Sequence, residues 1–337
     1  MNSALVCGGH GFIGHHMARR LKKEGYWVRT VDIKEYPYGD LKPDVDDYVI
    51  GDLRDINVCE RVIRPPEDIG ETFNEVYQFS AFMGGAGIVF SGDNDARIMH
   101  DSALLNINIA EVCSKVKPGK IFFSSSACVY NQLNQEVVDN PITVESSAYP
   151  AYPDSPYGWE KIFAEILWQS YARNHGLNVK IARFHNIAGP EGAWGNGREK
   201  SPAAMCRKVA EVNNGDVIEV WGDGEQTRSF LYIDECLEAV RRLMASDFSG
   251  PINIGSDEMV SINKLVEMVK GIANKPDIKI KHIEGPLGVR GRNSDNCLIK
   301  EKLGWAPNYP LIEGLKKTYP WIEEQIKSGK EDCPWSN

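Results

Sequence analysis

The sequence lacks the features that mark secreted, membrane-embedded or nucleic-acid-binding proteins. No apolar run reaches 18 residues, so nothing predicts a transmembrane helix. The chain passes directly from Met1 into an expected strand and a glycine-rich turn, a start that is not typical of a signal peptide. No run of Lys and Arg is long enough to follow a nucleic acid, and the net charge of -9 disfavours a polyanionic partner. We therefore expect a cytoplasmic protein without a membrane or nucleic-acid partner.

Patterns of paired cysteines and of metal ligands are also missing. None of the eight cysteines stands in a Cys-x-x-Cys pair, and the seven histidines form no metal-binding pattern with them. Reduced thiols are the simple explanation, which fits a cytoplasmic location. The sequence gives no reason to expect a metal site.

The composition and the order of the expected elements predict an α/β fold. The 337 residues, with 42% hydrophobic and 25% charged side chains, suffice for one large domain with a smaller lobe. Strand and helix patterns alternate from residue 4 to about 185, which predicts a Rossmann-type doubly wound parallel sheet. We assign 1–185 plus about 230–250 to an NAD-binding domain. A smaller α/β substrate lobe takes 186–229 plus about 251–330, including 253–255, and 331–337 is a loose tail.

A glycine-rich turn follows the first expected strand. Gly8, Gly11 and Gly14 allow a tight turn, a close approach of a pyrophosphate and close helix packing, and the helix that begins near Phe12 and Ile13 offers free N–H groups to an anion. This spacing is typical of dinucleotide-binding turns, although glycine clusters also occur in ordinary loops.

The second expected strand ends in Asp32, where a carboxylate would hold the adenosine ribose and repel a 2′-phosphate. This position favours NAD over NADP, and the alternative is a helix N-cap or turn residue. Asp52 and Leu53 follow the third strand and could meet the adenine, or form an Asx turn. Ala81 follows the fourth strand, where small residues let a cofactor lie against the backbone. The glycines that come next, including Gly85, leave room for a second ligand, unless the loop makes no contact at all.

The central strand, 120–123, ends in a run of hydroxyls and a thiol. In an open parallel sheet ligands bind beyond the carboxyl ends of the strands, so Ser126, or Ser125, and Cys128 are expected to face a ligand. Tyr157 and Lys161 lie four residues apart and therefore share one helix face. A phenol beside an ammonium group can lose its proton near neutral pH, so we predict that Lys161 lowers the pKa of Tyr157. The alternative is a buried strand end and an amphipathic helix without a catalytic role.

Together these motifs resemble the extended short-chain dehydrogenase/reductase family. The strings SSSACVY, YGWEK, GPEGAWGNGREKSPAAMCRK, WGDGEQTRSF and GVRGRNSDN are similar to the members of it that epimerise GDP-sugars. The resemblance implies bound NAD, a homodimer, and conversion of GDP-mannose or a related GDP-sugar to GDP-L-galactose, or to GDP-L-gulose. It also implies that Cys128 is the base and Lys200 the acid that invert a sugar carbon beside a transient ketone, with Ser126, Tyr157 and Lys161 completing the catalytic set.

The same resemblance assigns a set of substrate-binding residues. They are Gly85, Ser126, Ala127, Cys128, Asn186, Glu199, Lys200, Lys208, Gln226, Thr227, Arg228 and Arg290. Lys208, Arg228 and Arg290 suit the diphosphate, because its charge needs point or forked cations.

Three other functions remain open at this stage. A GDP-4-keto-6-deoxymannose epimerase/reductase of the GDP-fucose synthase type would use NADPH, which Asp32 disfavours. An epimerase of a related GDP-heptose would keep the same acid and base. A NAD-binding sensor would bind the cofactor without turnover, and the intact Ser126, Tyr157 and Lys161 disfavour it.

Overall fold

The computed structural model describes residues 1–286 and 288–330, so the tail expected at 331–337 lies outside the described residues. In the described part, the central sheet has seven parallel strands in the order β11-β6-β5-β4-β1-β2-β3. The strands are β1 (Ser3–Cys7), β2 (Trp27–Asp32), β3 (Asp47–Ile50), β4 (Glu75–Gln78), β5 (Lys120–Ser126), β6 (Val179–Phe184) and β11 (Ile252–Ile254). The predicted doubly wound α/β fold is thereby confirmed.

Helices cover both faces of this sheet because successive side chains of each strand point to opposite sides. In β1, Ala4 and Val6 pack into a core with α1, α7 and α9, whereas Leu5 and Cys7 pack into a second core with α2, α4 and α5. These helices are α1 (Phe12–Lys23), α2 (Ile56–Val62), α4 (Asp95–Val116), α5 (Pro156–His175), α7 (Ile233–Ala245) and α9 (Cys297–Leu303). Near-continuous apolar strands are what a sheet buried on both faces requires.

The strand order reverses between β1 and β4, and parallel sheets bind ligands at such a switch point. The turn after β1 opens α1, with Gly11 in the N-cap position. All seven strands run in the same direction, so their carboxyl ends meet at one edge of the sheet.

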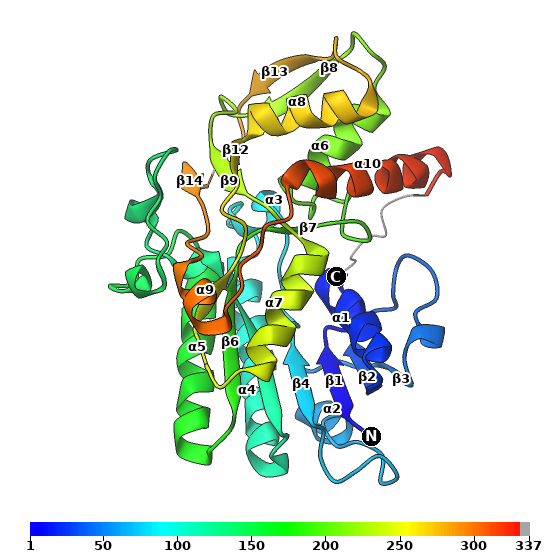
Figure 1. Cartoon of the computed structure of the whole chain (residues 1–337), viewed down its shortest axis with the longest axis vertical. Coiled ribbons are helices and arrows are strands. Elements are labelled where there is room, and N and C mark those ends of the chain that lie inside the picture. Colours follow the sequence, from blue (N-terminus) through cyan, green and yellow to red (C-terminus); the bar gives the residue numbers. More distant parts are fainter. Residues whose placement is uncertain (287, 331–337) are drawn as a thin grey trace.

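The smaller lobe lies above this edge (Figure 1). Its core joins α6, α8 and α10 to the parallel pair β8 and β13. The strands β9, β12 and β14 form a second small sheet, and β7 pairs with β10. The bounds are α3 (Ala86–Val89), β7 (Ile187–Ala188), α6 (Ser201–Glu211), β8 (Val217–Trp221), β9 (Thr227–Ser229), β10 (Leu231–Tyr232), β12 (Met259–Ser261), α8 (Ile262–Ala273), β13 (Lys279–Ile283), β14 (Gly291–Arg292) and α10 (Leu311–Lys327).

The structure corrects the placement of two segments, because both α9 and residues 253–255 pack on the large sheet and not in the substrate lobe. Residues 253–255 were assigned to the substrate lobe, but β11 pairs in parallel with β6 at the edge of the large sheet. Ile252 and Ile254 are fully buried in the same core as α7. A strand of three residues carries too little periodicity to show which sheet it joins, because that depends on the tertiary packing of its side chains.

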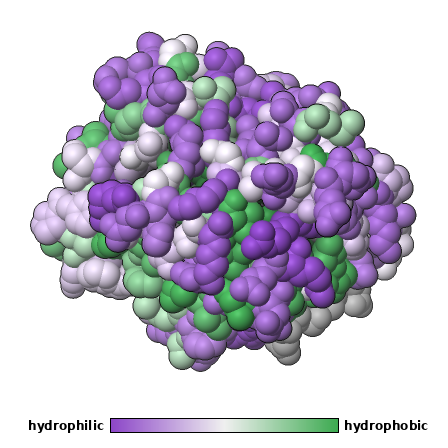
Figure 2. Space-filling model, turned by 90° about the horizontal axis from the view of Figure 1, so that it is seen from below, coloured by the Kyte–Doolittle hydropathy of each residue, from purple (hydrophilic) through white to green (hydrophobic). Residues whose placement is uncertain are grey.

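The surface opposite the small lobe is mostly hydrophilic, with smaller apolar areas between the polar ones (Figure 2). No helix within residues 1–286 and 288–330 combines the length and apolar character that a membrane span needs.

Candidate active site

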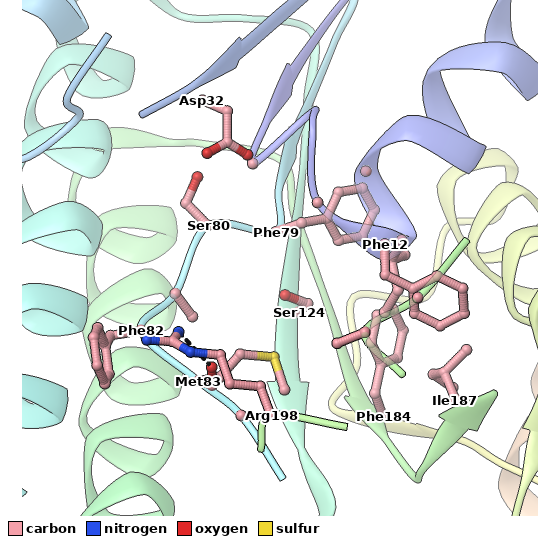
Figure 3. Close-up of a pocket in the computed structure, with 18 of the residues that line it drawn as sticks. Phe12, Asp32, Phe79, Ser80, Phe82, Met83, Ser124, Phe184, Ile187 and Arg198 are labelled. Carbon is pink, nitrogen blue, oxygen red and sulfur yellow. Dashed lines mark hydrogen bonds between the residues drawn. The ribbon is translucent and has the colours of Figure 1, made fainter. Parts of the chain in front are cut away.

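A cleft of about 340 Å³ lies between the carboxyl edge of the sheet and the segment that leads into α6 (Figure 3). Every residue of the predicted cofactor-binding set lines it, from the glycine turn to Tyr157 and Lys161. Those residues are Gly8, Gly11, Phe12, Ile13, Gly14, Asp32, Asp52, Leu53, Ala81, Tyr157 and Lys161. Distant parts of the chain thus contribute to one cavity at the switch point of the sheet.

The glycine turn fits a dinucleotide. Gly8 has a φ of +74°, a conformation that glycine adopts without strain. A Cβ at Gly14 would lie 2.0 Å from the carbonyl oxygen of Gly8, so no side chain can be accommodated where the helix packs on the turn. At the end of β2, Asp32 accepts a hydrogen bond from the backbone N–H of His10 at 3.2 Å, and burial raises the pKa of its carboxyl.

The side chain of Asp52 forms the Asx turn that was the alternative to an adenine contact. Its Oδ1 accepts a hydrogen bond from the backbone N–H of Arg54 at 2.9 Å, and its Oδ2 lies 2.7 Å from Nη2 of Arg54. Hydrogen bonds from Arg54 lower the pKa of Asp52. Arg54 also pairs with Asp101 at 2.8 Å, so this wall of the cleft is fixed by an ion-pair network.

The two candidate serines after the central strand have different partners. Ser125 donates a hydrogen bond to Oε1 of Glu165 at 2.5 Å, in a buried group that also holds Arg183. Ser126 accepts a hydrogen bond from the backbone N–H of Cys128 at 3.2 Å and hydrogen-bonds to the phenol of Tyr157. Because alternate residues of a strand face opposite sides, the geometry favours Ser126 over Ser125 as the hydroxyl that faces a substrate.

That Lys161 and a nicotinamide charge together lower the pKa of Tyr157 stays a prediction, because the protein groups that act on the phenol have the opposite net effect. Burial raises the pKa of the phenol, Cys128 adds to this effect, and the hydrogen bond from Ser126 opposes it. Lys161 donates to the carbonyl oxygen of Ser124 at 3.0 Å, and burial lowers the pKa of its own ammonium group. The buried surroundings disfavour the charged form of both groups, so helical spacing alone does not activate the phenol.

Sequence reasoning missed Arg292, the residue that contacts the thiol of Cys128. Its Nη1 lies 3.2 Å from the Sγ of Cys128, its Nη2 pairs with Asp154 at 3.0 Å, and its Nε donates to Gln135 at 2.5 Å. Burial disfavours the guanidinium charge, but Cys128 and Asp154 more than offset this and raise the pKa of Arg292. A guanidinium at this distance stabilises a thiolate.

Lys200 lies in the same cleft, at the N-cap of α6. Burial lowers the pKa of its ammonium group, while the nearby Cys128 raises it. Lys200 forms no ion pair with any residue that the structure describes. A lysine of this kind exchanges a proton near neutral pH more readily than a surface lysine does.

Within the predicted substrate-binding set, Glu199 and Gln226 carry buried oxygen atoms, Oε2 and Oε1, without a hydrogen-bond partner among the described residues. Asn186 donates to the carbonyl oxygen of Ser229 at 3.1 Å. Gly85 packs against the chain itself, because a Cβ there would lie 2.3 Å from the carbonyl oxygen of Glu199. Buried polar atoms without partners are typical of a ligand site.

The three predicted diphosphate ligands lie in different surroundings. Arg228 donates to the carbonyl oxygens of Thr227 and Val289 at 2.7 Å each, and burial together with the charge of Arg292 lowers its pKa to about 10. Arg290, in contrast, is half-exposed and pairs with Asp223 at 3.0 Å. Lys208 donates to the carbonyl oxygen of Glu219 at 2.6 Å. None of the three lines the cleft.

Beside the glycine turn, tertiary folding brings together His15, His16 and Glu191, with their ligand atoms within 4.8 Å of one another. No pattern in the sequence predicts this group. Oε2 of Glu191 already accepts Nη1 of Arg19 at 2.6 Å and the hydroxyl of Tyr36. These cationic and phenolic partners make the group an ion-pair cluster that joins α1 to the segment after β7.

The fold and the site together define an enzyme of the Rossmann class, with a dinucleotide cleft and a Ser-Tyr-Lys group at its edge. Residues 4–255 match the family model "NAD dependent epimerase/dehydratase family", and the chain belongs to that family. NAD is therefore its cofactor, and the resemblance to short-chain dehydrogenases is confirmed.

Known proteins that are similar to this chain agree with that assignment. It is 46% identical over 325 residues to GDP-mannose 3,5-epimerase of Arabidopsis thaliana, covering 96% of this chain and 83% of that one. It is 44% identical to GDP-mannose 3,5-epimerase 1 of Oryza sativa subsp. indica, covering 96% and 82%. The solved structure of UDP-glucose 4-epimerase from Thermotoga maritima with UDP-glucose matches with a TM-score of 0.81 and 26% identity, covering 96% and 99%.

Proposed function

We propose that this enzyme is a GDP-mannose 3,5-epimerase, which converts GDP-mannose to GDP-L-galactose. One observation carries the proposal: the thiol of Cys128 lies 3.2 Å from a buried guanidinium and packs beside Tyr157, which lines the cleft together with Ser126 and Lys200. A thiolate and an ammonium group form an acid and base pair for inverting a carbon. The similarity to plant GDP-mannose 3,5-epimerases supports the choice of sugar.

The chemistry begins at carbon 4, because the hydrogens on carbons 3 and 5 of a hexose are not acidic. When bound, NAD supplies a reversible acceptor for the hydride of carbon 4. Tyr157 takes the proton of the 4-hydroxyl. Ser126 donates its O–H to the resulting oxygen, because a ketone oxygen can only accept a hydrogen bond. Tyr157 would accept this proton more readily beside the positive charge of an oxidised nicotinamide ring, which would oppose the rise in its pKa caused by burial and Cys128.

Inversion then takes place beside the ketone. Cys128, whose sulfur lies 3.2 Å from the guanidinium of Arg292, removes a proton from carbon 3 or carbon 5 on one face of the ring. Lys200 returns a proton on the other face, and burial lowers its pKa toward the range in which it can do so. Lys161 holds the strand end through the carbonyl of Ser124, which keeps Tyr157 and Ser126 in register.

The diphosphate of the sugar nucleotide would contact Arg228, and the orphaned oxygens of Glu199 and Gln226 would accept hydroxyl or amide donors. Lys208 and Arg290 remain predicted contacts. Both would have to exchange their present partners for the phosphate.

We also propose that the enzyme acts as a homodimer in the cytoplasm. Large apolar side chains are exposed along α4 and α5, among them Ile107, Phe163 and Ile166, with 39%, 41% and 48% of their surfaces accessible. Apolar residues gathered on neighbouring helices are typical of an interface between copies. A reducing compartment keeps a catalytic thiol in its free form, which favours the cytoplasm.

Isotope exchange tests the proposal. The purified protein is incubated with GDP-mannose in deuterium oxide without NADPH, and deuterium at each ring carbon is followed by NMR and mass spectrometry. We expect incorporation at carbons 3 and 5, its loss in Cys128→Ala, and normal exchange in the control Cys297→Ala, which alters an exposed cysteine. Exchange confined to carbon 5 would make GDP-L-gulose the product. No exchange from GDP-mannose, although NAD is bound, would refute the substrate and direct the search to 4-keto-6-deoxy and heptose nucleotides.

A further inference from the structure

Two arginines contact one aromatic ring at the cofactor cleft. The Cζ of Arg97 lies 4.6 Å from the centre of the Phe82 ring, and the Cζ of Arg198 lies 5.2 Å from it. These residues come from α4, from the loop after β4 and from the segment that precedes α6. All three line the cleft, and Figure 3 shows Phe82, Met83 and Arg198 along one side of it. We call this group the Arg-Phe-Arg stack.

The backbones that carry the stack are in tight contact. A Cβ at Gly85 would lie 2.3 Å from the carbonyl oxygen of Glu199 and 3.3 Å from that of Arg198. Arg198 also reaches the carbonyl oxygen of Met83 with a long contact of 3.5 Å. The segment before α6 therefore closes directly on the loop after β4, and Gly85 is required because any side chain would separate them.

The charges of the stack are not balanced. Arg97 pairs with Asp101 at 3.3 Å, and that carboxylate is shared with Arg54. Arg198 has no carboxylate partner among the residues that the structure describes, and it lies close enough to Arg97 for the two charges to repel. Two positively charged side chains lie against one ring beside a cleft for a dinucleotide. They would attract an anion that binds in the cleft between the lobes.

We propose that the Arg-Phe-Arg stack is a clasp that closes over bound NAD, with Arg198 attracting the pyrophosphate of the cofactor. An enzyme that returns its hydride to the same sugar gains from a cofactor that stays bound through many turnovers. Because Arg198 belongs to the segment before α6 and Phe82 to the edge of the large sheet, the clasp ties the substrate lobe to the cofactor. This role is independent of the identity of the sugar.

Release of NAD from the purified enzyme tests the clasp without any sugar. The bound NAD is reduced in place, and its escape into a scavenging dehydrogenase is followed by the loss of fluorescence. We expect Arg198→Ala and Phe82→Leu each to raise the dissociation rate about tenfold or more, since each removes a cation–π contact and the first also removes a charge. Arg198→Lys keeps the charge but loses the planar stack, so its NAD dissociation rate should lie between those of the parent and of Arg198→Ala. The control is Arg61→Ala, which removes an exposed arginine of α2.

Two further measurements separate the clasp from a structural role and from the sugar diphosphate. Added salt should speed NAD release from the parent enzyme more than from Arg198→Ala, because only the parent uses the guanidinium charge. GDP affinity of the NAD-loaded Arg198→Ala variant should stay within about twofold of the parent, since no charge that binds GDP is lost. Unchanged NAD release in both Arg198→Ala and Phe82→Leu would overturn the clasp, as would weakened GDP binding with normal NAD release. If Arg198→Ala does not fold, the NAD dissociation rates of Phe82→Leu and Arg198→Lys decide whether the clasp exists.

Discussion

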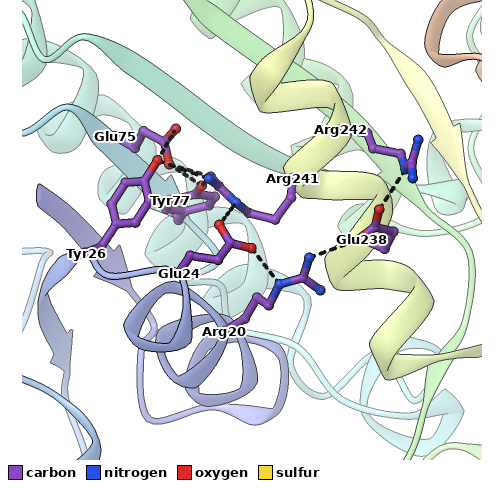
Figure 4. Close-up of polar contacts among 8 residues, drawn as sticks. All are labelled: Arg20, Glu24, Tyr26, Glu75, Tyr77, Glu238, Arg241 and Arg242. Atoms are coloured by element: carbon purple, nitrogen blue, oxygen red, sulfur yellow. Dashed lines mark hydrogen bonds and ion pairs between the residues drawn. The ribbon is translucent and has the colours of Figure 1, made fainter. Parts of the chain in front are cut away.

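Two regions of the molecule gather buried or half-buried charges, and they use them in opposite ways. Between α1 and α7, acidic and basic side chains alternate in a network of Arg20, Glu24, Tyr26, Glu75, Tyr77, Glu238, Arg241 and Arg242 (Figure 4). Arg241 pairs with Glu24 at 2.8 Å and with Glu75 at 2.5 Å, and Arg20 joins Glu24 to Glu238 at 2.5 and 2.8 Å. Each arginine of this network has a carboxylate partner.

Around Cys128 the balance is different. Lys161 is buried and Lys200 is half-buried in the cleft, and among the described residues neither forms an ion pair. Arg292 has one carboxylate, that of Asp154. The network fixes two helices against each other with charges that have no further task, whereas the site keeps cations available for a substrate and a thiolate. The comparison shows that pairing of charges, more than burial, separates a structural region from a reactive one.

The largest effect should come from the phenol of the site. Tyr157→Phe removes the group that takes the proton of the 4-hydroxyl, so we expect kcat to fall by about 10²- to 10⁴-fold. The free energy of unfolding should change by less than about 1 kcal/mol, because the hydrophobic ring stays in place. Kinetics and urea unfolding on the same preparation check both. A large loss of stability with little loss of rate would mean that the site is as structural as the network.

In the ion-pair network between α1 and α7, we expect a large loss of stability with no loss of kcat. Arg241→Leu leaves Glu75 nearly buried without its partner, so we expect a loss of about 3 to 5 kcal/mol in the free energy of unfolding. The kcat of the folded enzyme should not change. Arg242→Leu is the matched control, because that side chain is 41% exposed and its pair should contribute less than about 1 kcal/mol. Equal losses from the two variants would contradict the distinction.

The site should also resist further positive charge. Burial, with help from Arg292, Arg183 and Lys200, lowers the pKa of His185 from its ordinary 6.5 to about 3. The unfolded chain therefore binds a proton below pH 6.5 that the folded chain refuses. His185 therefore does not reduce the free energy of unfolding above pH 6.5. As the pH falls from 6.5 toward 3, the free energy of unfolding decreases by about 1.4 kcal/mol per pH unit.

Urea unfolding between pH 7.5 and 4.5 measures this loss. His185→Gln should flatten the pH dependence by about that amount, whereas His282→Gln, at an exposed position, should leave it unchanged. An unaltered slope in His185→Gln would show that the cations around the site do not exclude a proton.

The smallest effect concerns Arg290, which already has a partner outside the cleft. Arg290→Ala should change the KM for the GDP-sugar by less than about threefold, as expected for an exposed ion pair. Arg228→Ala should raise it by about tenfold or more, because a charge-assisted contact to a phosphate is lost. Steady-state kinetics measures the KM for the GDP-sugar in both variants. A larger effect from Arg290 than from Arg228 would mean that Arg290 leaves Asp223 when the substrate binds.

Local sequence determined the parts of this protein that depend on neighbouring residues. The glycine spacing from Gly8 to Gly14, the carboxylate at the end of β2 and the Tyr-x-x-x-Lys turn of α5 each lie within one strand, turn or helix. Backbone geometry fixes such features, so the cofactor cleft and the fold class were predictable.

Tertiary structure decided what depends on distant residues. Only packing shows that the hydroxyl of Ser125 donates to Glu165, whereas that of Ser126 accepts the N–H of Cys128, and that burial raises the pKa of Tyr157. Arg290 and Arg292 lie two residues apart, yet one pairs at the surface and the other contacts Cys128 across 164 positions of chain. The physical reason is that charge and burial depend on everything within a few ångströms, and a linear pattern records only the neighbours along the chain.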